Sequence, residues 1–334
     1  MTIDLAFAWY AIIGFAVLMY VVMDGFDLGV GLLFPFVKDS RKRDIMTNTI
    51  APVWDGNETW LVLGGGGLYA VFPLAYSVAL TALYAPLIAM LLALVFRGVA
   101  FEFRFRDPGH KLWWDRAFYG GSALATFCQG IVLGAFVQGI DTEGRLYAGG
   151  WFDWLTPFSL FCGVALLVGY ALLGAAWLVM KTEGDLQSRC FEFLVPLAFW
   201  ILLAILIVSL WTPFLNADIA KRWFAWPNIA WFSPVPLLVA VTAVLLFRSI
   251  LKRHEVQPFI FSLLLFILAY AGLGISLFPN IIPPDITYVQ AAAPDSSLKF
   301  LLVGASVLVP VILIYTAYGY WVFRGKVRGD EGYH

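Results

Sequence analysis

The sequence predicts an all-α, polytopic membrane protein. Of its 334 residues, 61% are hydrophobic and only 13% are charged, and its mean hydropathy is +0.84. Soluble domains are roughly half apolar and a quarter charged. Long apolar runs without strict alternation favour membrane-spanning helices over a β-barrel. The net charge of −1 gives no basic excess that would suggest binding to nucleic acid.

Nine apolar runs are long enough to cross a bilayer, which takes about 20 residues in a helix. We expect spans at residues 7–36, 59–76, 78–103, 117–138, 155–180, 194–215, 229–247, 259–279 and 298–323. The seventh run is the weakest because Pro234 and Pro236 interrupt its start. The first run lacks the basic segment and cleavage site of a secretory signal, so we expect it to be retained.

The connections between these runs are too short for a soluble domain. We therefore expect one integral-membrane domain over residues 1–334, with halves at 1–139 and 155–280 and a last helix at 298–323. This grouping predicts two antiparallel four-helix bundles side by side and one peripheral helix. No sequence repeat supports the duplication, so it depends on the helix count alone.

The positions of Lys and Arg predict the orientation of the chain. Sixteen of them, among them Arg324, Lys326 and Arg328, fall in alternate connections, and only four fall in the others. Cytoplasmic loops carry the excess of Lys and Arg. With nine crossings, this places the N-terminus outside the cytoplasm, on the periplasmic side, and the C-terminus inside.

Ionisable residues at membrane depth are costly and point to function. Asp24 and Asp27 lie three residues apart on one face of the first helix, and Asp24 is about 25 Å along that helix, past the midplane. The neighbouring glycines permit close helix approach, which would bury both carboxyl groups against protein. For Asp24 we favour proton handling. Arg97 needs a buried partner, and pairing with Asp27 or with Asp24 is left open.

A second polar cluster, Trp54-Asp55-Gly56-Asn57-Glu58-Thr59-Trp60, directly precedes the span that contains Gly64–Gly67. Asp55 and Glu58 occupy a first helical turn, where carboxylates suit the helix dipole, so simple capping is an alternative to function. A helix cap does not require the tryptophans at both ends of this segment, Trp54 and Trp60, so they favour a functional role. Four consecutive glycines make sense where another backbone or a bulky ligand approaches closely.

The sequence offers few ligands for a metal or a haem. The histidines are His110, His254 and His334, which fall in predicted cytoplasmic loops and the tail. A haem bound within the helices needs a His, Met or Cys ligand there. The candidates are Met19, Met23, Met90, Cys128 and Cys162, which are more often packing residues. We expect this chain to ligate no haem, zinc or di-iron centre.

Three motifs together resemble subunit II of the cytochrome bd-type quinol oxidases of bacterial respiratory membranes. They are Asp24-Gly25-Phe26-Asp27-Leu28-Gly29-Val30-Gly31, the segment from Asn48 to Trp60 with its glycine run, and Phe96-Arg97-Gly98-Val99-Ala100-Phe101-Glu102-Phe103-Arg104. All lie in the first third of the chain. The short loops are most similar to the cyanide-insensitive branch of the family.

The resemblance implies an oxidase complex in the bacterial inner membrane. A homologous subunit I would carry two b-type haems and one d-type or third b-type haem and would form a heterodimer with this chain. The complex would oxidise quinol and reduce dioxygen to water with cytoplasmic protons, which generates proton-motive force without pumping. A small single-helix accessory subunit and a structural quinone are compatible with the resemblance.

The resemblance also implies roles for single residues. Asp55, followed by Asp24, would line the cytoplasmic entrance of a proton path into subunit I. Trp60 would lie near a hydrophobic dioxygen entry, and Trp54 beside the structural quinone. No role follows for Asp27, Arg97 or Glu58, and Glu58 occupies a position that can differ among members.

Two other functions fit the residues taken alone. Glycine-interrupted helices with intramembrane carboxylates are also typical of a proton-coupled secondary transporter. A third hypothesis is that the chain is a purely structural partner of another membrane protein. Co-purification with a haem-bearing chain would distinguish the oxidase from the transporter. The effect of Asp55→Asn on the rate of oxygen reduction would distinguish the oxidase from the structural partner.

Overall fold

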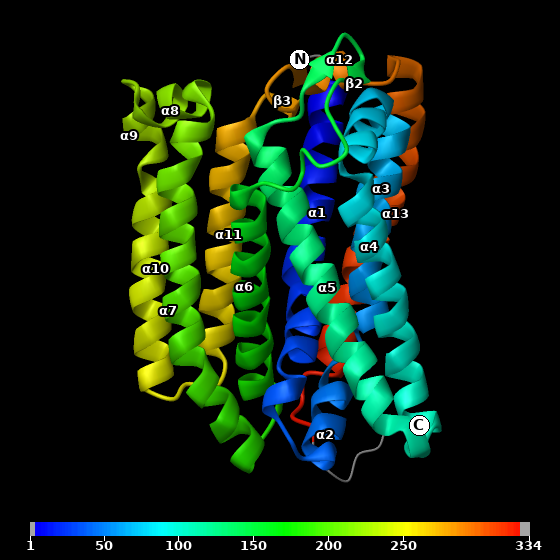
Figure 1. The fold of residues 1–334 in the computed structure, drawn as a ribbon, viewed down its shortest axis with the longest axis vertical. Helices are drawn as coiled ribbons and strands as arrows, with labels where there is room; N and C mark the ends of the chain where they lie inside the picture. The colour runs from blue at the N-terminus through cyan, green and yellow to red at the C-terminus, as the bar shows by residue number, and fades with distance from the viewer. Residues whose placement is uncertain (1–3, 328–334) are drawn as a thin grey trace.

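The protein is a bundle of long, roughly parallel helices with small strands and short helices at one end (Figure 1). The structure is a computed structural model that describes residues 4–327; Arg328 and His334, named above, lie outside them. The long helices are α1 (Leu5–Leu32), α3 (Trp54–Val71), α4 (Pro73–Arg106), α5 (Lys111–Gln138), α6 (Pro157–Lys181), α7 (Gly184–Leu215), α10 (Pro234–Leu251), α11 (Gln257–Leu277) and α13 (Asp295–Val322).

Short elements connect these helices. At the end where the N-terminus lies are two-stranded sheets and short helices, and α2 lies at the opposite end (Figure 1). They are η1 (Phe34–Phe36), α2 (Ser40–Ile50), η2 (Pro108–His110), β1 (Thr142–Glu143) with β2 (Leu146–Tyr147), α8 (Ala217–Phe224), α9 (Asn228–Phe232), β3 (Asn280–Ile282) with β4 (Ile286–Thr287), and α12 (Tyr288–Ala291).

The predicted all-α membrane class is confirmed. In the described part of the chain, eight helices are long and apolar enough to cross a membrane. The second predicted run, 59–76, begins in α3, which is not among the eight. The count of nine spans and the orientation of the termini therefore stay predictions.

The helices pack in two groups. Helices α1, α3, α4 and α5 contact one another, as do α6, α7, α10 and α11, and α13 lies against α1 and α3 (Figure 1). The two groups meet where α6 packs on α1 and α5. This packing agrees with the expected pair of bundles and peripheral helix, while the division into halves at 1–139 and 155–280 stays a prediction.

One predicted boundary is wrong for a simple reason. The sequence suggested a span at 59–76, but α3 ends at Val71 and α4 begins at Pro73, so the run contains the junction of two helices. Pro73 occupies the first position of α4, where its missing N–H costs nothing. Helix α2, whose N-cap Asp39 accepts a hydrogen bond from the Arg41 N–H at 2.9 Å, was not anticipated.

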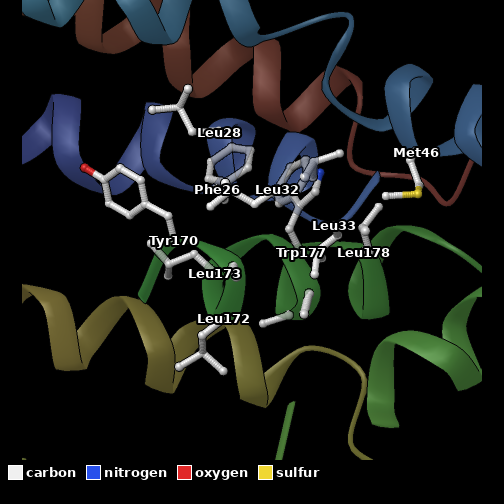
Figure 2. Close-up of a cluster of buried hydrophobic side chains, with 14 of the residues drawn as sticks. Phe26, Leu28, Leu32, Leu33, Met46, Tyr170, Leu172, Leu173, Trp177 and Leu178 are labelled. Atoms are coloured by element: carbon white, nitrogen blue, oxygen red, sulfur yellow. The ribbon is translucent and has the colours of Figure 1, made fainter. Parts of the chain in front are cut away.

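Helices α1 and α6 pack closely against each other. Figure 2 shows the side chains of this core, including Phe26 of α1 and Trp177 of α6, whose rings stack with centroids 4.3 Å apart. Backbones approach so closely that a Cβ built on Gly29 would lie 1.9 Å from the carbonyl oxygen of Tyr170. The glycines therefore allow the close helix approach that the sequence led us to expect.

A buried ion cluster fixes the end of the molecule opposite the N-terminus. Arg104 of α4 is 1% exposed. It pairs with Asp44 of α2 and Asp115 of α5, both at 2.5 Å. Arg43 of α2 joins at 2.7 Å from Asp115, and Lys111 at 2.7 Å from Asp44. Arg104 thus ties α2, α4 and α5 together.

The segment after α13 is tied to the second helix group. The Lys181 ammonium donates to the Gly325 carbonyl oxygen at 2.7 Å, and the Val327 N–H donates to the Lys181 carbonyl oxygen at 2.9 Å. Lys326 pairs with Glu255 at 2.8 Å. Hydrogen bonds from Lys326 and Gln187 hold the pKa of the Glu255 carboxyl below its usual value.

We predict that Gly29→Ala destabilises the protein, because the new methyl group must displace the α6 backbone. Overpacking of this kind costs about 1–3 kcal/mol. The thermal midpoint of the purified complex measures the effect. Gly274→Ala in α11 is the control, since a Cβ there meets nothing within 4 Å; equal midpoints for the two variants would contradict the close contact.

We predict that Arg104→Met prevents stable assembly or lowers the thermal midpoint strongly, because it leaves two carboxylates without their buried cation. Removing one partner of a buried ion pair costs about 3–5 kcal/mol. Arg106→Met is the matched control, because Arg106 is exposed and its 3.6 Å pair with Glu102 lies at the surface, where pairs contribute about 0–1 kcal/mol. A normal midpoint for Arg104→Met would refute the cluster's structural role.

Candidate functional site

The candidate site is a polar cluster buried where α1, α3 and α4 meet. Helix α1 supplies Asp24 and Asp27, both fully buried. Helix α4 supplies Arg97, 1% exposed, and the first turns of α3 supply Asn57 and Glu58. The cluster therefore lies between helices and not on the surface that lipid would contact.

Arg97 is the single cation of this cluster in the described structure. Its Nη1 pairs with Glu58 Oε1 and lies 3.4 Å from Asp24 Oδ1. Its Nε and Nη2 are buried and have no hydrogen-bond partner among residues 4–327. The guanidinium carbon lies 6.0 Å from the Trp54 ring and 5.9 Å from the Phe118 ring, so aromatic faces cover it. Nη1 is thus the Arg97 nitrogen nearest both carboxyl groups, while Nε and Nη2 have no hydrogen-bond partner among residues 4–327.

The pair of Asp27 with Arg97 that the sequence suggested is not among the ion pairs of the described residues. Asn57 instead donates to Asp27 Oδ2 at 2.7 Å. The Tyr320 hydroxyl of α13 donates to Asn57 Oδ1 at 2.8 Å. A neutral amide therefore takes the position expected for the cation, and Arg97 pairs with Asp24, the other partner considered.

A separate pair of hydrogen bonds lies near the carboxyl groups and joins α1, α5 and α6. Gln129 of α5 donates from Nε2 to the Tyr20 hydroxyl at 2.7 Å. The Tyr170 hydroxyl of α6 donates to Gln129 Oε1 at 2.9 Å. Tyr20 lies four residues before Asp24, on the same face of α1. These two bonds therefore link the two helix groups across α5.

Sequence reasoning missed Tyr20 and Gln129 as members of this site, and it placed Asn57 and Glu58 in a separate polar cluster without connecting them to Asp27 and Arg97. Two signals were available. Glu58 lies three residues after Asp55 and Tyr20 four residues before Asp24, spacings that share a helix face. Nothing in the sequence indicated that Gln129, 105 positions after Asp24 in the numbering, would lie near it.

The other sequence-predicted residues surround this cluster. Asp55 is exposed in the first turn of α3. The cap of that helix is Val53, which makes no side-chain capping bond, so Asp55 is not itself the capping residue. Trp54 is half-buried, with its ring 5.0 Å from that of Phe101. Trp60 is 1% exposed, and its Nε1 has no hydrogen-bond partner in the part of the chain that is described.

Neither of the two histidines in the described part of the chain lies inside the helix bundle. His110 is exposed and lies 3.0 Å from Asp107, and His254 is exposed as well. Met90 and Cys128 are buried within the main apolar core. Across residues 4–327, no group of three or more His, Cys, Asp or Glu side chains is placed to hold a metal ion.

Comparison with known proteins identifies the family. The model of the family described as cytochrome bd terminal oxidase subunit II matches residues 5–323. The chain belongs to this family. The resemblance drawn from the three motifs is therefore confirmed, and with it the assignment to a terminal-oxidase complex and to a multi-pass protein of the bacterial inner membrane.

Individual relatives match over nearly the whole chain. Cytochrome bd-I ubiquinol oxidase subunit 2 of Escherichia coli K12 is 31% identical, over 98% of this chain and 96% of its own length. Cytochrome bd ubiquinol oxidase subunit 2 of Bacillus subtilis is 28% identical, over 97% of each. A solved structure of bd oxidase from Geobacillus thermodenitrificans has a TM-score of 0.79 at 17% identity, covering 96% of this chain and 99% of that chain. That structure supports the fold.

We predict that Asn57→Leu destabilises the complex, because it removes the buried donor to Asp27 and the acceptor for Tyr320 at nearly constant volume. A buried polar group left without its partner costs about 1–3 kcal/mol. The fraction of complex that survives a heat challenge in detergent, measured by size-exclusion chromatography, reports the loss. Thr59→Val on the same helix is the control, since Thr59 is exposed and bonds only to the Gly56 carbonyl. Equal survival of both variants would show that Asn57 is dispensable.

Proposed function

We propose that this chain is the subunit of a quinol oxidase that ligates no haem, supports the haem-bearing subunit I, and conducts protons toward dioxygen reduction. The observation that carries the proposal is the series of acids from Asp55, exposed, to Asp24, fully buried beside Arg97. Carboxyl groups at membrane depth are costly and are characteristic of proton relays. A cap or a purely structural pair would not need acids at successive depths.

The direction of the path follows from the predicted orientation. Asp55, Glu58 and Asp24 lie in the half of the bundle whose connections carry most Lys and Arg, the half that we assign to the cytoplasm. Protons for water formation would enter there, and quinol protons would leave on the opposite side. This separation generates proton-motive force without a pump. The protein contributes the positions of the acids, and the haems of subunit I supply the oxygen chemistry when bound.

The outer face of α3 supports contact with subunit I. A Cβ built on Gly65 or on Gly66 meets nothing within 4 Å, whereas one on Gly67 lies 2.4 Å from Ile13 of α1. Half of the glycine run thus packs inside the chain and half faces outward. Small residues on an outward face suit helix packing against protein within a membrane. We assign this face to subunit I, which would place the end of the acid series beside the partner.

Two aromatic residues are assigned to ligands of the complex. Trp54 offers a half-buried indole beside Phe101 and Arg97, which suits the ring of a structural quinone. Trp60 lies edge-on to Phe15 at 5.8 Å within an apolar cluster that includes Ala16 and Met23, which suits the passage of dioxygen. A small accessory subunit and contacts with membrane lipid complete the proposed assembly.

We predict that Asp24→Asn and Asp55→Asn leave assembly and haem content intact but slow steady-state oxygen consumption several-fold. The amide keeps the shape of each side chain and cannot carry a proton. Haem spectra of the purified complex measure assembly, and an oxygen electrode with excess quinol measures turnover. The slowing should increase as pH rises, because protons then become scarcer.

Asp107→Asn is the control for this experiment, since Asp107 also lies near the Lys- and Arg-rich end but pairs with exposed His110. It should turn over at the native rate. A native rate of oxygen consumption in Asp24→Asn would show that Asp24 is only a counter-ion of Arg97. A native rate in Asp55→Asn would show that Asp55 contributes only a favourable interaction with the helix dipole.

A further inference from the structure

Three carboxyl groups share a single guanidinium in the buried cluster. Glu58 and Asp24 contact Arg97 Nη1 directly, and Asp27 lies within electrostatic reach of the same cation. The titratable groups that face the cluster are Tyr20, Asp24 and Asp27 from α1, Asp55 and Glu58 from α3, Arg97 from α4, Tyr170 from α6 and Tyr320 from α13. The residue from α5, Gln129, is neutral.

Charge balance favours a proton within this cluster. If Glu58, Asp24 and Asp27 were all ionised, one guanidinium would leave two negative charges uncompensated in a medium of low dielectric constant. Such charges are neutralised by taking up protons. The fully buried Asp24 and Asp27 already outnumber Arg97, so this arrangement favours a proton on at least one of the three carboxyl groups.

Asp55, Glu58 and Asp24 differ stepwise in exposure, and the last two contact Arg97. Asp55 is exposed, the Glu58 side chain is 25% exposed, and the Asp24 side chain is 1% exposed. Asp55 and Glu58 are three residues apart on α3 and share a face of that helix. Glu58 is thus the acid that reaches both water and the buried cation.

The way the N–H donors of Arg97 are used argues against Glu58 being only a fixed structural partner of Arg97. A guanidinium has five N–H donors, and a fixed structural pair would use separate nitrogens for its two carboxylates. Here Nη1 faces both Glu58 and Asp24, while Nε and Nη2 lack partners among residues 4–327. A small rotation of the guanidinium would strengthen one pair at the expense of the other.

We propose that Glu58 is the proton carrier between Asp55 and Asp24, and that Arg97 moves its ion pair to whichever of Glu58 and Asp24 is ionised. In this step a proton leaves a carboxyl oxygen of Glu58 and arrives at a carboxylate oxygen of Asp24. Glu58 becomes the anion that pairs with Arg97, and Asp24 becomes neutral. No electrons move, and the total charge is unchanged. The inference rests on the proposed proton path and adds a positioned residue to it.

The test uses Glu58→Gln in the assembled, haem-containing complex. We expect quinol-driven oxygen consumption to fall roughly tenfold at neutral pH, less than a directly acting acid or base contributes because water still carries protons past the site slowly. The rate should recover toward low pH and on addition of formic acid, a small diffusible proton carrier. A merely structural glutamate would show neither recovery.

The matched control is Glu102→Gln, which removes an exposed glutamate on α4 that pairs only with Arg106. It should keep the native rate and pH profile. Native rate and pH profile in Glu58→Gln would overturn the inference. Should Glu58→Gln fail to assemble, Glu58→Asp decides, because its carboxyl group is one methylene further from Arg97: slower turnover with a displaced pH profile supports the carrier role, and native behaviour overturns it.

The outcome separates the inference from the function on which it rests. If Asp24→Asn and Asp55→Asn slow oxygen consumption while Glu58→Gln does not, the proton path stands and Glu58 is only a counter-ion. If all three variants turn over at the native rate, the proton path itself fails.

Discussion

The charge of Arg97 is the constraint on which the candidate site of this protein depends. A buried guanidinium must be compensated, and the chain compensates it with carboxyl groups from two other helices, Asp24 of α1 and Glu58 of α3. In the proposed function, the same arrangement that satisfies Arg97 would also hold exchangeable protons, because the acids outnumber the cation. Stability and the proposed proton handling would then have one physical origin.

The packing of α1 makes this arrangement possible. Gly29 lets the α6 backbone approach α1, so the turns of α1 that carry Asp24 and Asp27 are enclosed by protein and not by lipid. At the same end of the molecule, the Arg104 cluster fixes α2 and α5 to α4, the helix that presents Arg97. The position of one side chain is thus set by contacts from most of the first helix group.

The sequence predicted those features that depend on composition and on helical spacing. Apolar runs gave the helical membrane class. Asp24, Asp27 and Arg97 were recognised because charge is costly at membrane depth, and Asp55 was recognised from its polar cluster and the family resemblance. What it did not predict depends on contacts between distant segments: the neutral partner of Asp27, the burial of Arg104 and the link through Gln129. The break at Pro73 was missed because both helices there are apolar, and hydropathy does not distinguish a junction from a continuous span.

A density map of the assembled complex, at a resolution that shows ordered water, would test whether these acids form a proton path. We expect an unbroken file of water molecules and polar side chains from the cytoplasmic surface past Asp55 and Glu58 to Asp24 and Arg97, continuing into the haem-bearing subunit. A map in which Asp24 is enclosed by carbon atoms on every side except Arg97, with no water reaching it from either subunit, would contradict the account.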